Sequence, residues 1–309
     1  MKDNAVFQAR GLALLFLLPT LLILLIFIYY PAIQAFVLSL HRANVLLGTR
    51  QFIGLGNFET LFTGVLSPRY RQVMVQSFIF SGLVVTLGIA FGVMLATLAS
   101  QKVRGARIYR LLLIWPFALS PAVAGTIFLF LFNPEIGTVN QVLDRLFGIE
   151  PRWLDTPVFA FGLVVAAAVW KNLGYNIVFY LAALQNIPTE YGEAAEIDGA
   201  GPLQRFWRIT WPMLSPMTFF LVFTNLTFSF FDAFGIIDII TKGGPIGPPP
   251  FDDAGLTTIM IYQVWRDGFG GSGNTGLAAA LGILILFIVA IITLLQFRYG
   301  GRQIQYGDN

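Results

Sequence analysis

Long runs of hydrophobic residues, separated by shorter polar segments, dominate the chain. A transmembrane helix needs about 20 mostly apolar residues, and its backbone hydrogen bonds must be made within the segment. The runs do not alternate apolar and polar residues, which excludes the strands of a membrane barrel. Six runs can span a bilayer, at about 12–33, 73–99, 111–132, 158–184, 213–235 and 276–297. The pattern predicts an all-α membrane protein with six transmembrane helices in a single domain, residues 1–309.

The composition supports lipid as the main solvent of this chain. Of the 309 residues, 56% are hydrophobic and 11% are charged, and the mean hydropathy is +0.74. A soluble domain carries about 25% charged residues. The net charge of +3 gives no electrostatic basis for binding nucleic acid. Because the chain has no cysteine and one histidine, His41, no thiolate or HExxH-type metal site is expected, which disfavours an intramembrane protease.

Basic residues predict which loops face the cytoplasm. Six spans put both termini on one side of the membrane, and Lys and Arg concentrate in cytoplasmic loops. The densest group follows the second span and consists of Lys102, Arg104, Arg107 and Arg110. We therefore expect this loop, both termini and the loop at 188–212 to be cytoplasmic. The opposite loops are rich in Gly and Pro, as at 243–245, which suits either a docking surface or ordinary connections.

The loop at 188–212 has the pattern of two short helices. Acidic residues, including Glu193, crowd the first helix, and Gly199 can end it because glycine tolerates left-handed backbone angles. Pro202 suits the first turn of the second helix. That helix has one apolar face, made by Leu203, Phe206, Trp207 and Thr210. Such a face needs either the membrane surface or a groove on a partner to cover it.

The spacing within this loop resembles the EAA motif of ABC importer permeases. The motif reads E-A-A, three residues, G, nine residues, I, one residue and usually L-P; here Trp211 replaces the Leu. In that family the loop is a coupling helix that docks into a cleft of the cytoplasmic ATPase. The resemblance implies that Glu193 fixes this helix against the ATPase and that Gly199 lets the backbone turn. The implied coupling residues are Glu193, Ala194, Ala195, Asp198, Gly199, Ile209 and Pro212.

The resemblance extends over nearly the whole chain. Segments 119–124, 132–134, 183–188 and 241–245 are similar to the carbohydrate-uptake branch of these permeases, which are type I importers with six core spans per subunit. Within this branch the chain is most similar to the A-type permeases of sn-glycerol 3-phosphate importers. The segments that carry this likeness are 169–171, 175–176, 198–202, 230–232, 266–269 and 296–299.

The resemblance implies a transport subunit of the bacterial inner membrane that works with partners. These are a second homologous permease, two ATP-binding subunits that dock on the 188–212 loop, and an extracytoplasmic solute-binding protein. The chain has no G-x-x-x-x-G-K-[ST] sequence, so ATP and Mg are expected on the partner ATPases and no cofactor is expected here. The implied solute is glycerol 3-phosphate or a related phosphodiester. A neutral sugar such as trehalose or maltose is the alternative.

Polar residues inside the fourth and fifth spans are candidates for the solute pathway, because a charge in a span usually faces a wet cavity or a partner. Lys171 could meet a phosphate or sugar hydroxyls, snorkel to the interface, or pair with Asp232. Its neighbours at helical spacing could bind a polyol or glue helices together. The candidates are Trp170, Lys171, Asn172, Tyr175, Asn176 and Phe179 in one span and Asn225, Ser229 and Asp232 in the other.

A stand-alone channel or secondary transporter is the alternative of another class. Secondary transporters are built from internal repeats with broken helices, and no convincing repeat is present here. The third span carries Pro116 and Pro121, which remove backbone hydrogen bonds and predict a kink. Kinks also occur in spans without a functional role, so this feature does not by itself identify a pathway.

Overall fold

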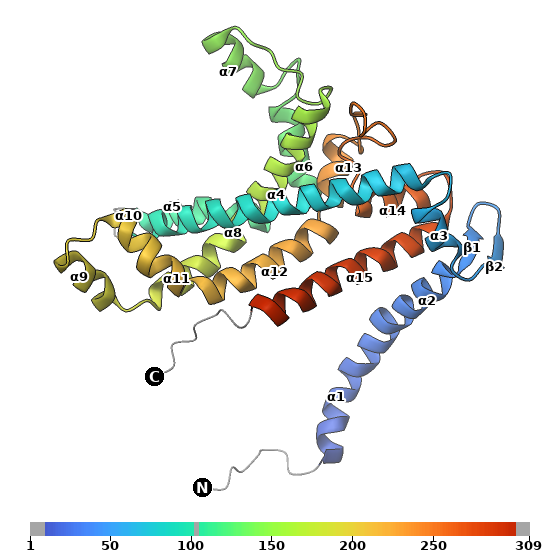
Figure 1. The fold of residues 1–309 in the computed structure, drawn as a ribbon, viewed down its shortest axis with the longest axis horizontal. Coiled ribbons are helices and arrows are strands. Elements are labelled where there is room, and N and C mark those ends of the chain that lie inside the picture. The colour runs from blue at the N-terminus through green and yellow to red at the C-terminus, as the bar shows by residue number, and fades with distance from the viewer. Residues whose placement is uncertain (1–9, 102–104, 301–309) are drawn as a thin grey trace. The chain divides into compact units, whose positions relative to one another are not determined.

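The computed structural model describes residues 10–101 and 105–300 (Figure 1). The basic residues Lys102 and Arg104 of the predicted cytoplasmic cluster, and the two ends of the chain, lie outside the described residues. The chain divides into two compact units. One unit comprises Met1–Gly64 with Val264–Leu284, and the other comprises Val65–Gln263 with Ile285–Asn309.

The first unit is built around an apolar helical rod. Helix α1 (Arg10–Leu24), the π-helical turn η1 (Leu25–Tyr29) and α2 (Tyr30–Ser39) follow one another without a break. The most apolar 18-residue window of this rod has none of its residues buried. Strands β1 (His41–Asn44) and β2 (Thr49–Phe52) pair antiparallel, and α3 (Gly56–Phe62) follows them. Asn57 fastens α3 to the end of the rod, because its side-chain amide donates to the carbonyls of Ser39 (2.7 Å) and His41 (2.9 Å).

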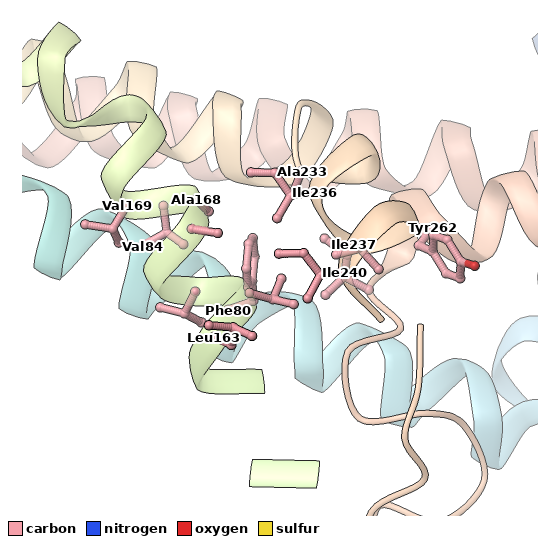
Figure 2. Packing of buried hydrophobic residues seen from close by; sticks show 14 residues of the cluster. Phe80, Val84, Leu163, Ala168, Val169, Ala233, Ile236, Ile237, Ile240 and Tyr262 are labelled. Carbon is pink, nitrogen blue, oxygen red and sulfur yellow. The ribbon is translucent and has the colours of Figure 1, made fainter. Parts of the chain in front are cut away.

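The second unit is organised by three long helices. Helix α4 (Ser67–Ser100) packs against α8 (Pro157–Gln185), and α12 (Ser215–Phe231) packs against both. In the N-terminal half of α8, a hydrophobic core joins α4, α8 and α13 (Phe234–Ile240) (Figure 2). Phe80 and Val84 of α4, Leu163 of α8, and Ile236 and Ile237 of α13 meet there. Further helices are α7 (Thr138–Phe147), α9 (Thr189–Ile197), α14 (Met260–Gly268) and α15 (Thr275–Gly300). The chain passes from one unit to the other within α14 and again within α15.

Two of the predicted spans are bent. Helix α5 (Ala106–Ile114) and the 3-10 turn η2 (Trp115–Ala118) meet α6 (Pro121–Leu131) at 106°. Pro121 begins α6 and the Ser120 hydroxyl accepts a hydrogen bond from the Val123 amide (3.3 Å), so the helix restarts with a cap. The predicted kink is therefore present, and the segment 111–132 is not one straight helix. Likewise, α10 (Pro202–Arg205), η3 (Phe206–Thr210) and α11 (Trp211–Met213) meet α12 at 69°.

The described residues contain four helices that are long and apolar enough to cross a membrane, at Leu14–Ser39, Ser67–Ser100, Pro157–Gln185 and Thr275–Arg298. The number rises to six if each bent pair is one span. Each of these helices and pairs overlaps one of the six hydrophobic runs. The bent pairs keep their backbone groups largely hydrogen-bonded within helical turns, as the interior of a bilayer requires.

Candidate functional site

An ion pair joins the middle of α8 to the end of α12. The ammonium of Lys171 lies 2.9 Å from the Asp232 carboxylate, and Asp232 is the residue that ends α12. The side chain of Lys171 is 8% exposed, whereas that of Asp232 is 43% exposed. The Asn172 side-chain oxygen lies 3.4 Å from the same ammonium, and the Phe117 ring centre lies 5.6 Å from it. Lys171 therefore has its charge neutralised from one side and covered on the others.

Aromatic rings continue from this ion pair along α8. The ring of Tyr175, one turn from Lys171, lies 5.3 Å from Phe117 of η2, 4.7 Å from Phe179 and 5.4 Å from Phe228 of α12, between ring centroids. Tyr175 and Phe179 are both half-buried, so part of this surface is open in the chain. Trp170 belongs to a separate group, with ring centroids 6.3 Å from Trp115 and 5.5 Å from Phe128.

The sequence singled out Tyr175 and Phe179 but neither Phe117 nor Phe228. Phe228 precedes Asp232 by four residues on the same helix, so helical spacing from Asp232 could have found it. Phe117 lies in the short turn between two prolines, where no periodicity points to a face. Its place beside Tyr175 follows from the bend between η2 and α6, which the sequence does not specify.

Asn176 and Asn225 lie between helices and away from any open surface. They are 0% and 1% exposed, and their side chains form a reciprocal pair, with N–O distances of 3.1 and 2.6 Å. Asn176 also donates to the Gly88 carbonyl of α4 (3.0 Å), and Asn225 donates to Leu221 of its own helix (2.7 Å). All four amide hydrogens are used. This arrangement favours the prediction of helix glue over that of solute contacts for these two residues.

Ser229 and Asn172 are also buried, at 2% and 5% exposure. The Ser229 hydroxyl donates to the Leu226 carbonyl in its own helix (2.8 Å), which removes it from the set of open polar groups. The Asn172 side-chain oxygen accepts a hydrogen bond from the Lys171 ammonium. Of the nine sequence-predicted pathway residues, the structure thus brings Lys171, Asp232, Tyr175 and Phe179 together around one partly open surface.

The segment at 188–212 folds as two helical pieces around a glycine turn. Helix α9 ends at Ile197, Asp198 caps it, and Gly199 adopts φ +77°, the left-handed region that favours glycine. The second piece starts at Pro202, and Arg205 spans the turn in an ion pair with Glu196 (2.8 Å). A cavity of about 380 Å³ lies beside the turn and includes Glu193 and Ile209 in its lining.

The outer surface of this segment carries exposed apolar side chains among charged ones. Ile197 is 86% exposed and Leu203 71%. Glu193, Glu196 and Asp198 are exposed as well. Ala194 and Pro212 are also exposed, and Ala195 is half-buried. Phe206, Trp207 and Trp211 line, with residues of α4, an apolar cavity of about 690 Å³. The two helical pieces thus present one face to the membrane-spanning helices and leave another free for a partner.

Comparison with known proteins gives consistent matches. Residues 88–303 match the family model described as binding-protein-dependent transport system inner membrane component. The sn-glycerol-3-phosphate transport system permease protein UgpA of Pectobacterium atrosepticum is 40% identical over 305 residues, covering 99% of each chain. UgpA of Salmonella typhimurium is 39% identical with the same coverage.

Solved structures agree at the level of the fold. A subunit of a bacterial ABC transporter involved in the import of the acidic polysaccharide alginate superposes with a TM-score of 0.78, at 23% identity over 94% of this chain and 96% of that chain. In a complex of the alginate transporter with a pentasaccharide-bound periplasmic protein, the TM-score is 0.80, at 23% identity over 96% of each chain. This chain shares that fold over nearly its full length.

Proposed function

Because the chain belongs to the family of binding-protein-dependent transport system inner membrane components, we propose that it is one of two membrane-spanning subunits of an ATP-driven importer of sn-glycerol 3-phosphate. It forms half of the translocation pathway and hydrolyses no ATP itself. Its partners are a second, related permease, two ATPase subunits that hold ATP and Mg, and a periplasmic solute-binding protein. Both termini and the 188–212 segment face the cytoplasm of a bacterial cell.

The observation that carries this proposal is the geometry of the 188–212 segment. Ile197 and Leu203 are exposed, and covering them with a partner would lower the free energy by about 25 cal/mol per Å² of apolar surface removed from water. The left-handed turn at Gly199 and the Glu196–Arg205 ion pair hold the two pieces in a fixed relation. We call residues 188–212 the knob; its exposed apolar side chains suit a cleft on an ATPase, with Glu193 at its side.

The knob leads into the transmembrane helix α12, so a movement of the knob can be passed on to that helix. Leu214 is fully buried, and its amide bonds the Thr210 carbonyl (3.0 Å), so the end of the knob and the start of α12 move together. Helix α12 ends at Asp232 in the candidate site. When the ATPases close on ATP, they push the knob, and α12 transmits the motion to the pathway. The permease pair then alternates between inward-open and outward-open states.

The choice of solute is supported by the relatives and by the chemistry of the site. The named relatives serve sn-glycerol 3-phosphate, and they align over 99% of this chain. A phosphate ester needs a cation, and Lys171 supplies the ammonium. The carbon skeleton of glycerol can pack against aromatic rings while its hydroxyls form hydrogen bonds. Tyr175 and its neighbouring rings provide such a surface, and the Tyr175 hydroxyl is the hydrogen-bonding group.

The test is the ATPase activity of the assembled importer, reconstituted with its solute-binding protein. We expect sn-glycerol 3-phosphate to stimulate hydrolysis and trehalose and maltose not to. Lys171→Ala should weaken this stimulation, whereas Arg152→Ala, which breaks an exposed ion pair with Asp155, should leave it unchanged. Stimulation by a neutral sugar alone would overturn the choice of solute and leave the permease role standing. Absence of any solute-stimulated hydrolysis in an assembled complex would overturn the role itself.

A further inference from the structure

We propose that the Asp232 carboxylate occupies the place that the phosphate of the solute takes, so that Lys171 exchanges an internal anion for an external one during transport. The inference rests on the proposed function, because it takes the solute to be a phosphate ester. It adds a selection step: only a solute that can replace a carboxylate reaches the cation. Asp232 is then a specificity-determining residue, although its own charge repels the solute.

The first support is the unequal exposure of the two partners. Lys171 is nearly enclosed, with Asn172 at 3.4 Å and the Phe117 ring centre at 5.6 Å from its ammonium. Asp232 is 43% exposed, and its carboxylate makes the closest contact with the ammonium, at 2.9 Å. An incoming group therefore approaches the ammonium from the side that Asp232 holds. A purely structural pair does not need one partner open to the pathway.

The second support is the position of Asp232 at the end of α12. The C-terminus of a helix carries partial negative charge, so a carboxylate is disfavoured there and a cation is favoured. Asp232 is held at this place by Lys171, and its exposed side lets it rehydrate when the contact breaks. The Asp232 carboxylate can therefore separate from Lys171 and be solvated by water, so it is not left as an unpaired charge in an apolar environment.

The third support is the chemistry of the competing groups. A phosphate monoester carries a charge of about −1.5 to −2 near neutral pH and offers three acceptor oxygens. It can satisfy the ammonium more fully than one carboxylate oxygen does. A neutral polyol cannot replace an ion-pair partner without leaving a buried charge unpaired, which is costly. The aromatic surface beyond the pair, from Phe117 to Phe228 around Tyr175, lies where the glycerol part of the ester would rest.

The absence of cysteine from the chain makes the exchange measurable. In the assembled importer with Asp232→Cys, the new thiol stands where the carboxylate stood, beside Lys171. Its reaction with the anionic reagent sulfonatoethyl methanethiosulfonate and with the cationic aminoethyl analogue is followed by the intact mass of this chain. Relative to their rates with Asp155→Cys, we expect the anionic reagent to react at least about tenfold faster than the cationic one, because the Lys171 ammonium attracts the first and repels the second.

Solute protection is the decisive readout. sn-Glycerol 3-phosphate and inorganic phosphate should each slow the labelling, whereas glycerol and trehalose should not. In Lys171→Met/Asp232→Cys, which carries no unpaired charge at the site, both the preference for the anionic reagent and the phosphate protection should disappear. Asp155→Cys, beside the exposed Arg152, is the matched control and should show no protection by any solute.

The outcomes separate this inference from the proposed function. Equal protection by glycerol and by its phosphate ester, or phosphate protection that survives Lys171→Met, would overturn the exchange. So would the absence of protection in a complex whose ATPase activity the phosphate ester stimulates, and the permease role would then stand. Stimulation only by a neutral sugar, even with protection by inorganic phosphate, would overturn the solute and with it the exchange during transport.

Discussion

Asn176 and Asn225 show what a single polar pair does inside a membrane helix bundle. Their reciprocal hydrogen bonds, together with the bond from Asn176 to the Gly88 carbonyl, tie α8 to both α12 and α4. In a region without water, neither amide can find a substitute partner. These residues hold the helices that position Lys171 and Asp232, one to two turns away on the same two helices.

The pair predicts a measurable coupling between the two positions. Asn176→Leu and Asn225→Leu should each lower the thermal stability of the assembled importer in nanodiscs, since each leaves the oxygen and one amide hydrogen of the remaining asparagine unpaired. The double variant should cost less than the sum of the two. The coupling should lie between about 0.6 kcal/mol, the average measured for polar contacts between membrane helices, and about 1.7 kcal/mol, the maximum.

The control for this cycle is Thr126→Val, whose hydroxyl bonds the Ala122 carbonyl within its own helix. Its effect should add to that of Asn176→Leu without coupling. Additive effects of the two asparagine substitutions would contradict the assignment of the pair as helix glue. They would bring back the interpretation of these amides as solute contacts.

Helical spacing shows which residues share a face but not what that face meets. Asn225, Ser229 and Asp232 form one polar stripe in the sequence, yet the first two are buried against helices and the third is half open. The difference depends on where α8 ends up, which is a tertiary property. The Lys171–Asp232 pair was foreseeable as an alternative because charges in spans seek partners. The contact between Lys171 and Phe117 was not foreseeable, because it depends on the bend after η2.

At the scale of elements, two glycines on α4 differ in what surrounds them. A Cβ at Gly92 would lie 2.7 Å from the Cβ of Asn176, so α4 and α8 approach each other through this gap. A Cβ at Gly82 would meet no atom within 4 Å. Close approach of backbones through small residues is the usual way in which helices pack in lipid.

Gly92→Ala should therefore destabilise the assembled importer by about 1–3 kcal/mol, the usual cost of overpacking. Gly82→Ala should be neutral or stabilising by up to about 1 kcal/mol, because alanine favours helix more than glycine does. Thermal unfolding of the two variants in the same nanodiscs checks the opposite signs. Equal effects would mean that α4 and α8 do not meet at Gly92.

The glycine turn in the 188–212 segment offers a second matched pair. Gly199 has φ +77°, whereas Gly201 has φ −68°, and a Cβ would meet no atom within 4 Å at either position. Gly199→Ala should cost about 1–2 kcal/mol of left-handed backbone strain, and Gly201→Ala should cost little. The strain should turn α9 away from α10 and lower the population of the docked knob about tenfold.

The readout for this pair is the stimulation of ATP hydrolysis by the solute-loaded binding protein. We expect Gly199→Ala to reduce the stimulation strongly while basal hydrolysis by the ATPase subunits persists, and Gly201→Ala to behave as wild type. Full stimulation in Gly199→Ala would show that the left-handed turn is dispensable for coupling.

The hydrophobic runs predicted the elements well where a span is straight and poorly where it bends. The run at 158–184 corresponds to α8 (Pro157–Gln185) within a residue at each end, because both ends are marked by polar or proline-containing loops. The run at 111–132 contains a 106° bend. Pro116 and Pro121 placed the bend, but its angle depends on packing against α8 and α13, which a local pattern does not contain.

At the scale of the whole molecule, the match to ABC transporter subunits confirms the predicted fold class. The most apolar window of the Leu14–Ser39 helix buries nothing within this chain, while the corresponding windows of α4 and α8 bury 39% and 56%. A helix of this kind is stable only against lipid or a neighbouring subunit. The chain therefore carries an outer surface suited to assembly, as expected for one half of a paired permease.

The orientation of the whole chain is the remaining global prediction, and it follows from loop charge and from the coupling role together. If the 188–212 segment docks on cytoplasmic ATPases, an even number of spans separates it from both termini, and the loop near Gln101 lies on the same side. The loop that contains Asp252 then faces outward. Both residues are exposed, so an introduced thiol can react with a membrane-impermeant maleimide.

In intact cells from which the outer membrane has been stripped, Asp252→Cys should be labelled at once, and Gln101→Cys only after the inner membrane is permeabilised. The unaltered chain has no cysteine and serves as the control for labelling at other groups. The reverse pattern would put the 188–212 segment outside the cell, where no ATP-driven partner could push it, and would overturn the coupling mechanism. The predicted pattern would place the exposed knob at the cytoplasmic side. Helix α12, which follows the 69° bend, would then connect the knob to the Lys171–Asp232 pair at the solute site.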